Sequence, residues 1–354
     1  MVKSFFQLSV FFFLTIFYDQ SANAQNQASQ FSGTGQFIQS GIIDAGLLGK
    51  AYLAPVFNGL GSGFNQGWAS SAKVKIGQVN LKFLGGLSFV SPVDQFFDAT
   101  TLGLSSNIQI NGSGISPTLT GSKNQGAELD IYSQNPKTGN AQLINSFNSP
   151  EGLGLNFVPF VIPQLSVGLP YNTEISVRLV PNVPVGNYKV GIYGGAFKHE
   201  ISSYIPLSPI DISFLAGYTR SNVSYGLNVQ PDPNAQNNTG GDYSNQVLNL
   251  KSSSLLIGLI ASKKLSVLTV HIGINYNHIS GLLSAIGTYP VDSFGPLGNR
   301  QVVNEQDPIK INSDPLSFFS ANGGLQLKLG FFSVFADGSL GNYNTVTGGV
   351  GFTF

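Results

Sequence analysis

The sequence contains no cysteine, one tryptophan, one methionine and three histidines among its 354 residues, and only 10% of its residues are charged. An average soluble protein carries about 25% charged residues. Without cysteine, the chain can form neither a disulfide framework nor a cysteine-based zinc site. Basic and acidic residues balance at 17 each, so no excess positive charge is present to neutralise a nucleic-acid backbone, and nucleic acid is not an expected partner.

Long hydrophobic runs are also missing after the N-terminal segment, which excludes transmembrane helices of roughly 20 apolar residues. The N-terminus itself has a short basic start at Met1-Val2-Lys3, an apolar run over residues 5–17, and small residues at Ala22 and Ala24. This order is typical of an export signal, and the alternative is a buried N-terminal helix. We expect a signal peptide over residues 1–24, cleaved after Ala24. Gln25 follows instead of cysteine, which argues against a lipid anchor.

What the chain has in abundance is glycine (43 residues), phenylalanine (27) and tyrosine (13). The last residues show how they are arranged: Val350, Phe352 and Phe354 alternate with Gly349, Gly351 and Thr353. Alternate side chains of a strand point to opposite faces, so this ending predicts a strand with one apolar face. In an exported chain of low charge, the pattern favours an all-β, closed antiparallel transmembrane β-barrel. A secreted soluble sandwich or propeller is the alternative.

The pattern divides the chain into three parts: the signal peptide (1–24), a leader with a helical plug segment (25–70) and an outer-membrane β-barrel (71–354). Apolar residues recur at helical spacing between Ile42 and Tyr52, which predicts a short helix over residues 40–66 that Pro55 breaks or kinks. This segment either fills the lumen as a plug or packs on the periplasmic rim.

Alternating stripes after Pro163, such as Leu165, Val167 and Leu169, predict 12–14 strands, with 14 preferred because bacterial barrels take even numbers. Residues 212–220 and 223–229 read as two strands joined by a turn. Residues 91–160 read as about two strands and long loops. Residues 230–245 and 287–314 read as long polar loops. Because unpaired backbone groups are costly in hydrocarbon, the strand near residue 80 is expected to pair with residues 346–354.

Several stretches together resemble an uncharacterised family of outer-membrane β-barrel proteins of Bacteroidota. They include residues 52–68, Gly168–Glu174 with Arg178–Pro181, Lys198–Ile201, Pro209–Ser213 and Leu325–Phe332. The arrangement is also distantly similar to long-chain fatty-acid transporter barrels, which implies 14 strands and an N-terminal plug. The ending at Val350, Phe352 and Phe354 looks like the C-terminal signature that the barrel-assembly machinery reads. The resemblance implies a bacterial outer-membrane location, with outer-membrane lipid and that machinery as partners.

Four residues are candidates for lumen or ligand contacts: Glu174, Arg178, His271 and Asn275. Glu174 and Arg178 share the inward face but lie about 13 Å apart along a strand, so each is expected to pair with other lumen groups. His271 and Asn275 share the less apolar face of their strand. His271 and His278 are separated by an odd number of positions and cannot hold one metal together. We expect no metal, no cofactor and no enzymatic activity.

The favoured function at this point is passive uptake of small hydrophobic molecules. A structural or accessory role in a surface or secretion complex is the alternative, with the loops at 230–245 and 287–314 as contact surfaces. A barrel hydrolase with His271 is the third possibility. It is weaker because the sequence has no G-x-S-x-G elbow.

Overall fold

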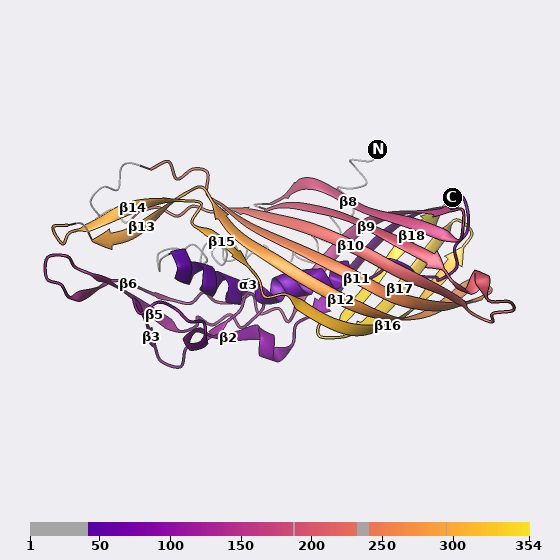
Figure 1. The fold of residues 1–354 in the computed structure, drawn as a ribbon, viewed down its shortest axis with the longest axis horizontal. Coiled ribbons are helices and arrows are strands. Elements are labelled where there is room, and N and C mark those ends of the chain that lie inside the picture. The colour runs from indigo at the N-terminus through magenta and orange to yellow at the C-terminus, as the bar shows by residue number, and fades with distance from the viewer. Residues whose placement is uncertain (1–41, 187, 232–240, 295) are drawn as a thin grey trace.

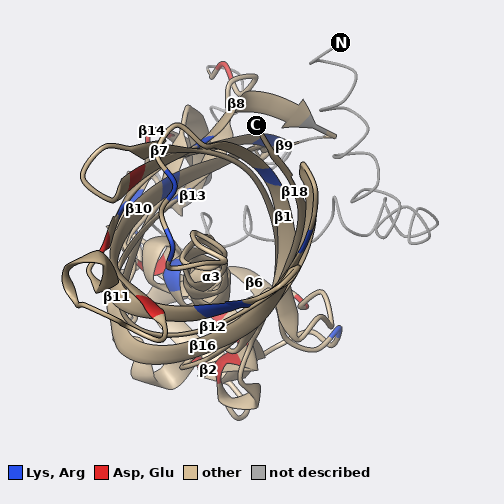
Figure 2. Ribbon diagram, turned by 90° about the vertical axis from the view of Figure 1, so that its right-hand side faces the viewer, with Lys and Arg blue, Asp and Glu red and all other residues tan. Residues whose placement is uncertain are grey.

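The computed structural model describes residues 42–186, 188–231, 241–294 and 296–354, and these form a closed antiparallel β-barrel of ten strands around one helix (Figures 1 and 2). Around the wall the order is β11, β10, β9, β8, β7, β1, β18, β17, β16 and β12, and β12 pairs again with β11. The barrel strands are β1 (Val79–Phe89), β7 (Phe157–Leu169), β8 (Thr173–Val185), β9 (Tyr188–Glu200), β10 (Asp211–Gly226), β11 (Val247–Leu265), β12 (Leu268–Ile286), β16 (Leu316–Leu329), β17 (Phe332–Leu340) and β18 (Thr345–Thr353).

Side chains alternate between the lumen and the outer surface along these strands, and the outer surface carries a continuous apolar belt. Large apolar side chains that lie outside are exposed, up to 80% for Phe319. The belt includes Leu165, Ile175, Val177, Leu179, Tyr193, Phe197, Tyr218, Ile257, Leu259, Ile272, Ile274, Leu325, Leu327, Val334 and Val346. An exposed apolar surface of this extent marks contact with lipid. The architecture is therefore that of an outer-membrane β-barrel protein.

The two ends of the barrel chain meet in the wall, as the sequence predicts. β18 pairs with β1 along nine positions, with Phe83 opposite Val350. Beyond the ladder, the backbone N–H groups of Val79 and Phe354 donate to each other's carbonyls at 3.0 and 2.8 Å. This closure removes the lipid-facing edges that an open sheet would expose.

The preferred count of 14 strands is wrong, because several strands are much longer than a membrane crossing requires. Residues 211–226 form the single strand β10, and the turn expected near residues 220–223 does not occur. β11 and β12 have 19 residues each, whereas about 9–11 residues suffice to cross. Their turn lies at residues 266–267, where Ser266 has a φ of 59°. Dividing the chain into strands of minimal length therefore counted too many.

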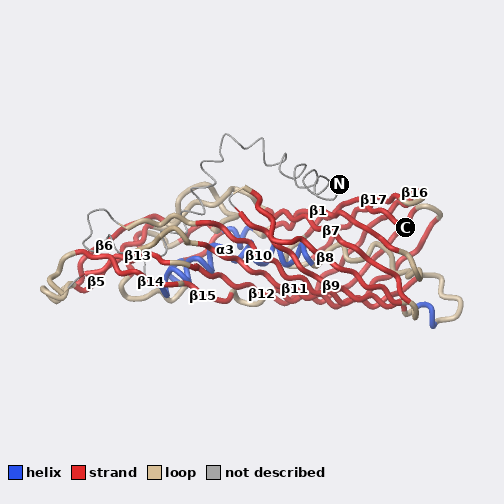
Figure 3. The backbone as a smooth tube through the Cα atoms, turned by 90° about the horizontal axis from the view of Figure 1, so that it is seen from above, coloured by secondary structure: helices blue, strands red, loops and turns tan. Residues whose placement is uncertain are grey.

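Three connections at one end of the barrel are short: residues 170–172, 266–267 and 330–331. We call this the short-turn end, and the opposite one the long-loop end. The C-terminus lies at the short-turn end (Figures 1 and 3).

An extension of small sheets stands beyond the barrel at the long-loop end (Figures 1 and 3). Residues 91–156 hold more structure than expected, and residues 287–314 hold strands instead of a loop. These strands are β2 (Phe96–Asp98), β3 (Ile108–Asn111), β4 (Ile115–Pro117), β5 (Glu128–Gln134), β6 (Ala141–Asn148), β13 (Thr288–Phe294), β14 (Arg300–Gln306) and β15 (Ile309–Asn312). β2 pairs with β4, β5 pairs with β3 on one side and β6 on the other, and β13 pairs with β14, while β15 extends the barrel sheet beside β12. Most of the expected loop at 230–245 lies outside the described residues.

Helix α3 (Ile42–Phe64) lies inside the ring of strands (Figure 2). It packs against β7, β11, β12 and β1, which places the segment in the lumen and not on the periplasmic rim. The helix continues through Pro55, so the expected break does not occur. Packing stabilises the helical turns on both sides of Pro55, since Tyr52, Leu53 and Phe57 are almost fully buried. No helix in the described part of the chain is both long and apolar enough to span a membrane, and the expected signal peptide lies outside it.

Candidate functional site

The lumen is occupied by the chain's own N-terminal segment. After α3 ends at Phe64, residues 65–78 run through the lumen to the short-turn end, where β1 begins. We call residues 42–78 the plug. Three glycines bring the helix directly against the wall: a Cβ at Gly59, Gly61 or Gly63 would clash with a wall side chain, for Gly59 at 2.6 Å from Val158. The plug is therefore fitted to this barrel and fills it closely.

Arg178 of β8 holds the plug at the end of the helix, and its side chain is 1% exposed. Its Nη1 donates to the carbonyl of Phe64 at 2.6 Å and its Nη2 to the carbonyl of Gln66 at 2.7 Å. Its Nε donates to Gln164 Oε1 at 2.9 Å, and the guanidinium stacks 3.5 Å above the ring of Trp68. The planar guanidinium fork suits this set of acceptors, which a lysine could not satisfy. One wall residue thus fixes three positions of the plug.

Glu174, four positions before Arg178, makes different contacts. Its carboxylate lies 3.1 Å from Lys198 Nζ of β9, and the same ammonium donates to the carbonyl of Ser71 in the plug at 3.0 Å. Glu174 and Arg178 do not pair with each other, as their separation along the strand predicts. The pair of Glu174 and Lys198 is buried, so each charge compensates the cost of burying the other.

A second carboxylate holds the plug near the short-turn end. Glu200 accepts from Lys73 Nζ at 2.8 Å and from the backbone N–H of Val74 at 2.8 Å. The hydrogen bond to the Glu200 carboxylate raises the pKa of the Lys73 ammonium above its usual value. The plug is thus tied to the wall at both ends of residues 65–78.

The ladder between β7 and β8 is incomplete. Both strands have 13 residues, but only six pairs join them, from Gln164 with Arg178 to Leu169 with Thr173. In the described structure, no backbone pairing joins residues 157–163 of β7 to residues 179–185 of β8, although each half pairs with its other neighbour. Proline has no N–H to donate and is confined to strand edges, and four prolines lie in these halves: Pro159, Pro163, Pro181 and Pro184. We call these two half-strands the seam.

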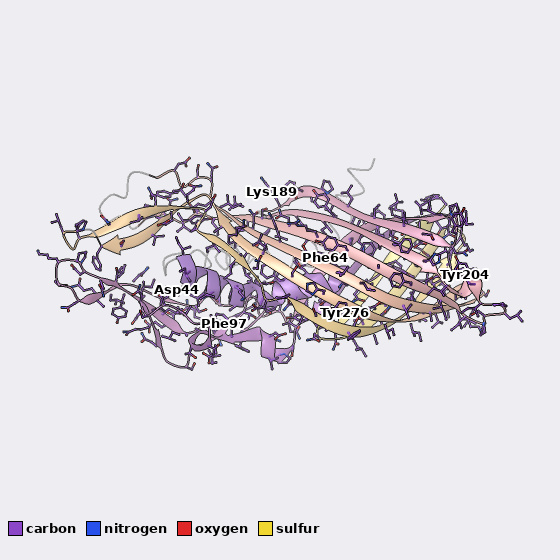
Figure 4. All side chains as sticks on the ribbon, viewed as in Figure 1. Asp44, Phe64, Phe97, Lys189, Tyr204 and Tyr276 are labelled. Carbon is purple, nitrogen blue, oxygen red and sulfur yellow. The ribbon has the colours of Figure 1, made fainter. Side chains whose placement is uncertain are left out.

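Apolar side chains close the seam from the lumen side. Phe160 and Ile162 of β7 and Val180 of β8 are buried in one cluster with Phe64 at the end of α3. The rings of Phe64 and Phe160 meet edge-to-face at 6.5 Å, and Figure 4 labels Phe64 within the barrel. Side-chain contacts therefore replace backbone hydrogen bonds as the closure here. Arg178 and Gln164 form the last pair of the ladder, next to the seam, so the residue that holds the plug also borders the seam.

His271 and Asn275 lie in a separate polar network on the other side of the lumen. His271 Nε2 lies 2.7 Å from Asp337 Oδ2, and Asn322 Nδ2 donates to the same oxygen at 3.0 Å. Asn275 in turn donates to Asn322 Oδ1 at 2.9 Å. Within the described part of the chain, His271 Nδ1 is buried without a hydrogen-bond partner, so no serine is positioned there for a hydrolase triad.

The structure thus divides the four lumen candidates into two sets that sequence alone did not separate. Glu174 and Arg178 hold the plug, while His271 and Asn275 belong to the network with Asp337. A ligand role for any of them stays a prediction. Among the described residues, no group of three or more His, Asp or Glu side chains is placed to hold a metal.

The C-terminal strand presents the expected apolar face outward. Phe352 lies opposite Leu81 and Phe332, and its ring is 5.7 Å from that of Phe332. Val350 lies one outward position before it, and Phe354 is 75% exposed. Recognition of these residues by the assembly machinery stays a prediction.

Sequence reasoning missed the partners of Arg178, namely Gln164 and Trp68, and it missed the seam. The plug residues that Arg178 contacts lie more than a hundred positions away in the chain, and Gln164 lies on the neighbouring strand, 14 positions away; no local pattern reveals these contacts. The seam did leave a signal, since prolines at positions 159, 163, 181 and 184 mark strands with an unpaired side.

A model of a family of unknown function, DUF6588, matches residues 1–354. The chain belongs to the DUF6588 family. No curated protein matches it.

Among solved structures, this DUF6588 chain is similar to the outer-membrane protease OmpT of Escherichia coli, with 10% identity over 78% of this chain and 97% of that one and a TM-score of 0.32. The Ail protein of Yersinia pestis shows 8% identity over 79% and 100% of the two chains, with a TM-score of 0.24. The translocator domain of NalP from Neisseria meningitidis shows 10% identity over 79% and 88%, with a TM-score of 0.26. Similarity at this level carries no information on function, and the link to fatty-acid transporters is not shown.

Proposed function

We propose that this protein lies in the bacterial outer membrane and admits small hydrophobic molecules through the seam between β7 and β8, with the plug as its gate. The long-loop end faces outward and the short-turn end faces the periplasm, as is usual for such barrels. The observation that carries the proposal is the unpaired half of the β7–β8 interface, which is closed only by an apolar cluster.

Two features of the lumen support a lateral route. At the seam, the cluster around Phe64, Phe160 and Val180 is apolar and can accept a hydrophobic solute without breaking hydrogen bonds. Between Arg178 and the short-turn end, the lumen is lined by charged and hydroxyl groups, among them Glu174, Lys198 and Ser166. Because an apolar solute would leave these polar groups unsatisfied, passage sideways into the hydrocarbon is favoured over passage down the barrel.

A cysteine pair across the seam tests the route, since the chain has no cysteine of its own. If the register continued past Gln164 and Arg178, Ile162 would face Val180, and both side chains lie in the same cluster. Bacteria producing the Ile162→Cys/Val180→Cys variant are compared under oxidising and reducing conditions. The readout is entry of N-phenyl-1-naphthylamine, a small aromatic probe that fluoresces in hydrocarbon. We expect oxidation to slow entry and reduction to restore it.

The matched control is the pair Ser166→Cys/Ser176→Cys, in the paired part of the same two strands. The two hydroxyl oxygens lie 2.7 Å apart, so a disulfide there locks a ladder that is already closed and should leave entry unchanged. Equal entry with the seam pair oxidised and reduced, once gels confirm the bridge, would contradict the lateral route. Entry no faster than in cells lacking the protein would contradict uptake altogether.

A structural or accessory role at the cell surface is the second candidate, and the extension at the long-loop end favours it. This extension is tied to the plug: Ser105 donates to Asp44 through its backbone N–H at 2.8 Å, and the N–H of Leu119 donates to the carbonyl of Tyr52 at 2.9 Å. In this role the plug anchors the extension, which serves as the contact surface. This role predicts no probe entry above background, and it predicts chemical cross-links to another surface protein that disappear when residues 288–306 are deleted. The absence of enzymatic activity stays a prediction.

A further inference from the structure

The outer surface of the wall carries a cleft of about 380 Å³ just beyond the apolar belt, over β10, β11 and β12. Arg220 and Lys251 line it together with the hydroxyl-bearing residues Ser253 and Ser280. Arg220 lies opposite Ser253, and Ser253 lies opposite Ser280, so these three form one row across the strands. The cleft is therefore a basic site with hydroxyl groups, built on the rigid sheet.

The position of this row relative to the belt is set by the strands. The preceding outward row consists of Tyr218, Leu255 and His278, and Tyr218 belongs to the exposed apolar belt. Arg220 follows Tyr218 by two positions on the same face. Aromatic side chains mark the interface between hydrocarbon and headgroups. The cleft thus lies where lipid phosphates begin, on the side of the long-loop end.

The charged side chains in the cleft have no partner among the described residues. There, the side chains of Arg220 and Lys251 take part in no ion pair or hydrogen bond. The nearby Asp314 is bonded instead to Lys50 at 2.7 Å. Two free cations beside the hydroxyl groups of Ser253 and Ser280 suit a multivalent oxyanion.

We propose that this cleft binds the phosphate group of an outer-leaflet lipid, whose acyl chains lie along the adjacent apolar belt. Arg220 and Lys251 contact the phosphate oxygens, and Ser253 and Ser280 add hydroxyl donors. Two further lysines that are exposed on neighbouring strands, Lys189 and Lys310, extend the positive charge for a headgroup with a second phosphate. The site is independent of the seam and of any uptake activity.

Native mass spectrometry of the full chain tests the assignment, with lipid A, which carries phosphates, and diacylglycerol, which carries none and should not be retained, as the two probe lipids. Wild type is compared with the Arg220→Gln/Lys251→Gln variant. The control Lys263→Gln/Lys264→Gln removes the same charge from β11 at the other end of the belt. We expect the first variant to retain lipid A about a hundredfold less well, since it removes two contacts to the phosphate that are each worth roughly a factor of ten. The control should match wild type.

Three results would overturn the assignment. Equal retention of lipid A by wild type and the Arg220/Lys251 variant would remove the cleft from lipid binding. An equal loss of lipid A retention in the Lys263/Lys264 control would show that the effect comes from net charge and not from this cleft. Displacement of lipid A by inorganic phosphate alone would show that the cleft takes a free anion and not a lipid. Folding of each variant is checked by the shift in gel mobility between unheated and boiled samples.

Discussion

Replacing Arg178 with alanine should release the plug while leaving the barrel closed. The change removes the donors for the carbonyls of Phe64 and Gln66, which then remain buried without partners. An unsatisfied buried acceptor costs about 1–3 kcal/mol, so the two carbonyls together destabilise the seated plug by about 2–6 kcal/mol. At roughly 1.4 kcal/mol per factor of ten, the population of the released plug rises by about 30-fold to 10⁴-fold. The wall keeps its ladders, because the backbone pairing of β8 does not require this side chain.

The single tryptophan of the chain provides the assay. Trp68 is 2% exposed and stacks on the Arg178 guanidinium, so its fluorescence reports directly on whether the plug is seated. In Arg178→Ala we expect a red-shifted emission and faster quenching by acrylamide. Arg178→Lys, which keeps the charge but not the planar fork, should give an intermediate result.

The outward-facing Arg220→Ala variant is the matched control, since it removes one arginine from a neighbouring part of the wall without touching the plug. Its emission should equal that of wild type. If Arg178→Ala retains wild-type emission and quenching while gel mobility shows a folded barrel, then Arg178 does not hold the plug. A wholly unfolded Arg178→Ala barrel would equally refute the separation of plug and wall.

Two further changes test the fit of the plug and the lumen network. Gly63→Val should destabilise the protein by about 1–3 kcal/mol through overpacking against the wall. Gly338→Ala should not, because Gly338 has open space around it. An equal shift of the urea midpoints of both variants would contradict a close fit of the plug. Asp337→Ala should cost about 1–3 kcal/mol of stability for each of the two donors that lose their acceptor, on His271 and Asn322. Asp337→Asn should cost less. An unchanged urea midpoint for the alanine variant would show that the network does not stabilise the barrel.

The barrel and its closure were predictable because alternation is a local property of sequence. Successive residues of a strand must face different surroundings, so Ile175 and Val177 read as outward and Glu174 and Arg178 as inward, and the structure places them so. The number of strands was not predictable, because alternation shows where a strand continues but not where it leaves the membrane. β10 keeps the same alternation past Arg220 into the long-loop end, so the assumption that each strand only just crosses the membrane divides this strand into two.

The contacts of Arg178 within the lumen could not be predicted from the sequence for a different reason. Alternation gives the side of the wall on which Arg178 lies, but its acceptors at Phe64 and Gln66 depend on how far the plug inserts. That depth is set by the close approach of helix glycines such as Gly61 and Gly63 to wall side chains, which is a matter of three-dimensional fit. The seam is the intermediate case, since its prolines stand in the sequence but their meaning requires knowing that β7 and β8 are neighbours.

Arg178 borders the seam and holds the plug, and this has a consequence for the proposed opening of the barrel. Arg178 and Gln164 form the last pair of the β7–β8 ladder and are also hydrogen-bonded through their side chains. Any widening of the seam that separates these two residues also pulls the guanidinium from the plug carbonyls. Conversely, a plug that leaves its position removes Phe64 from the cluster that closes the seam. Each event lowers the cost of the other, which is the reciprocal coupling expected of two linked equilibria. An opening of the wall without movement of the plug, or the reverse, is therefore the less favourable path.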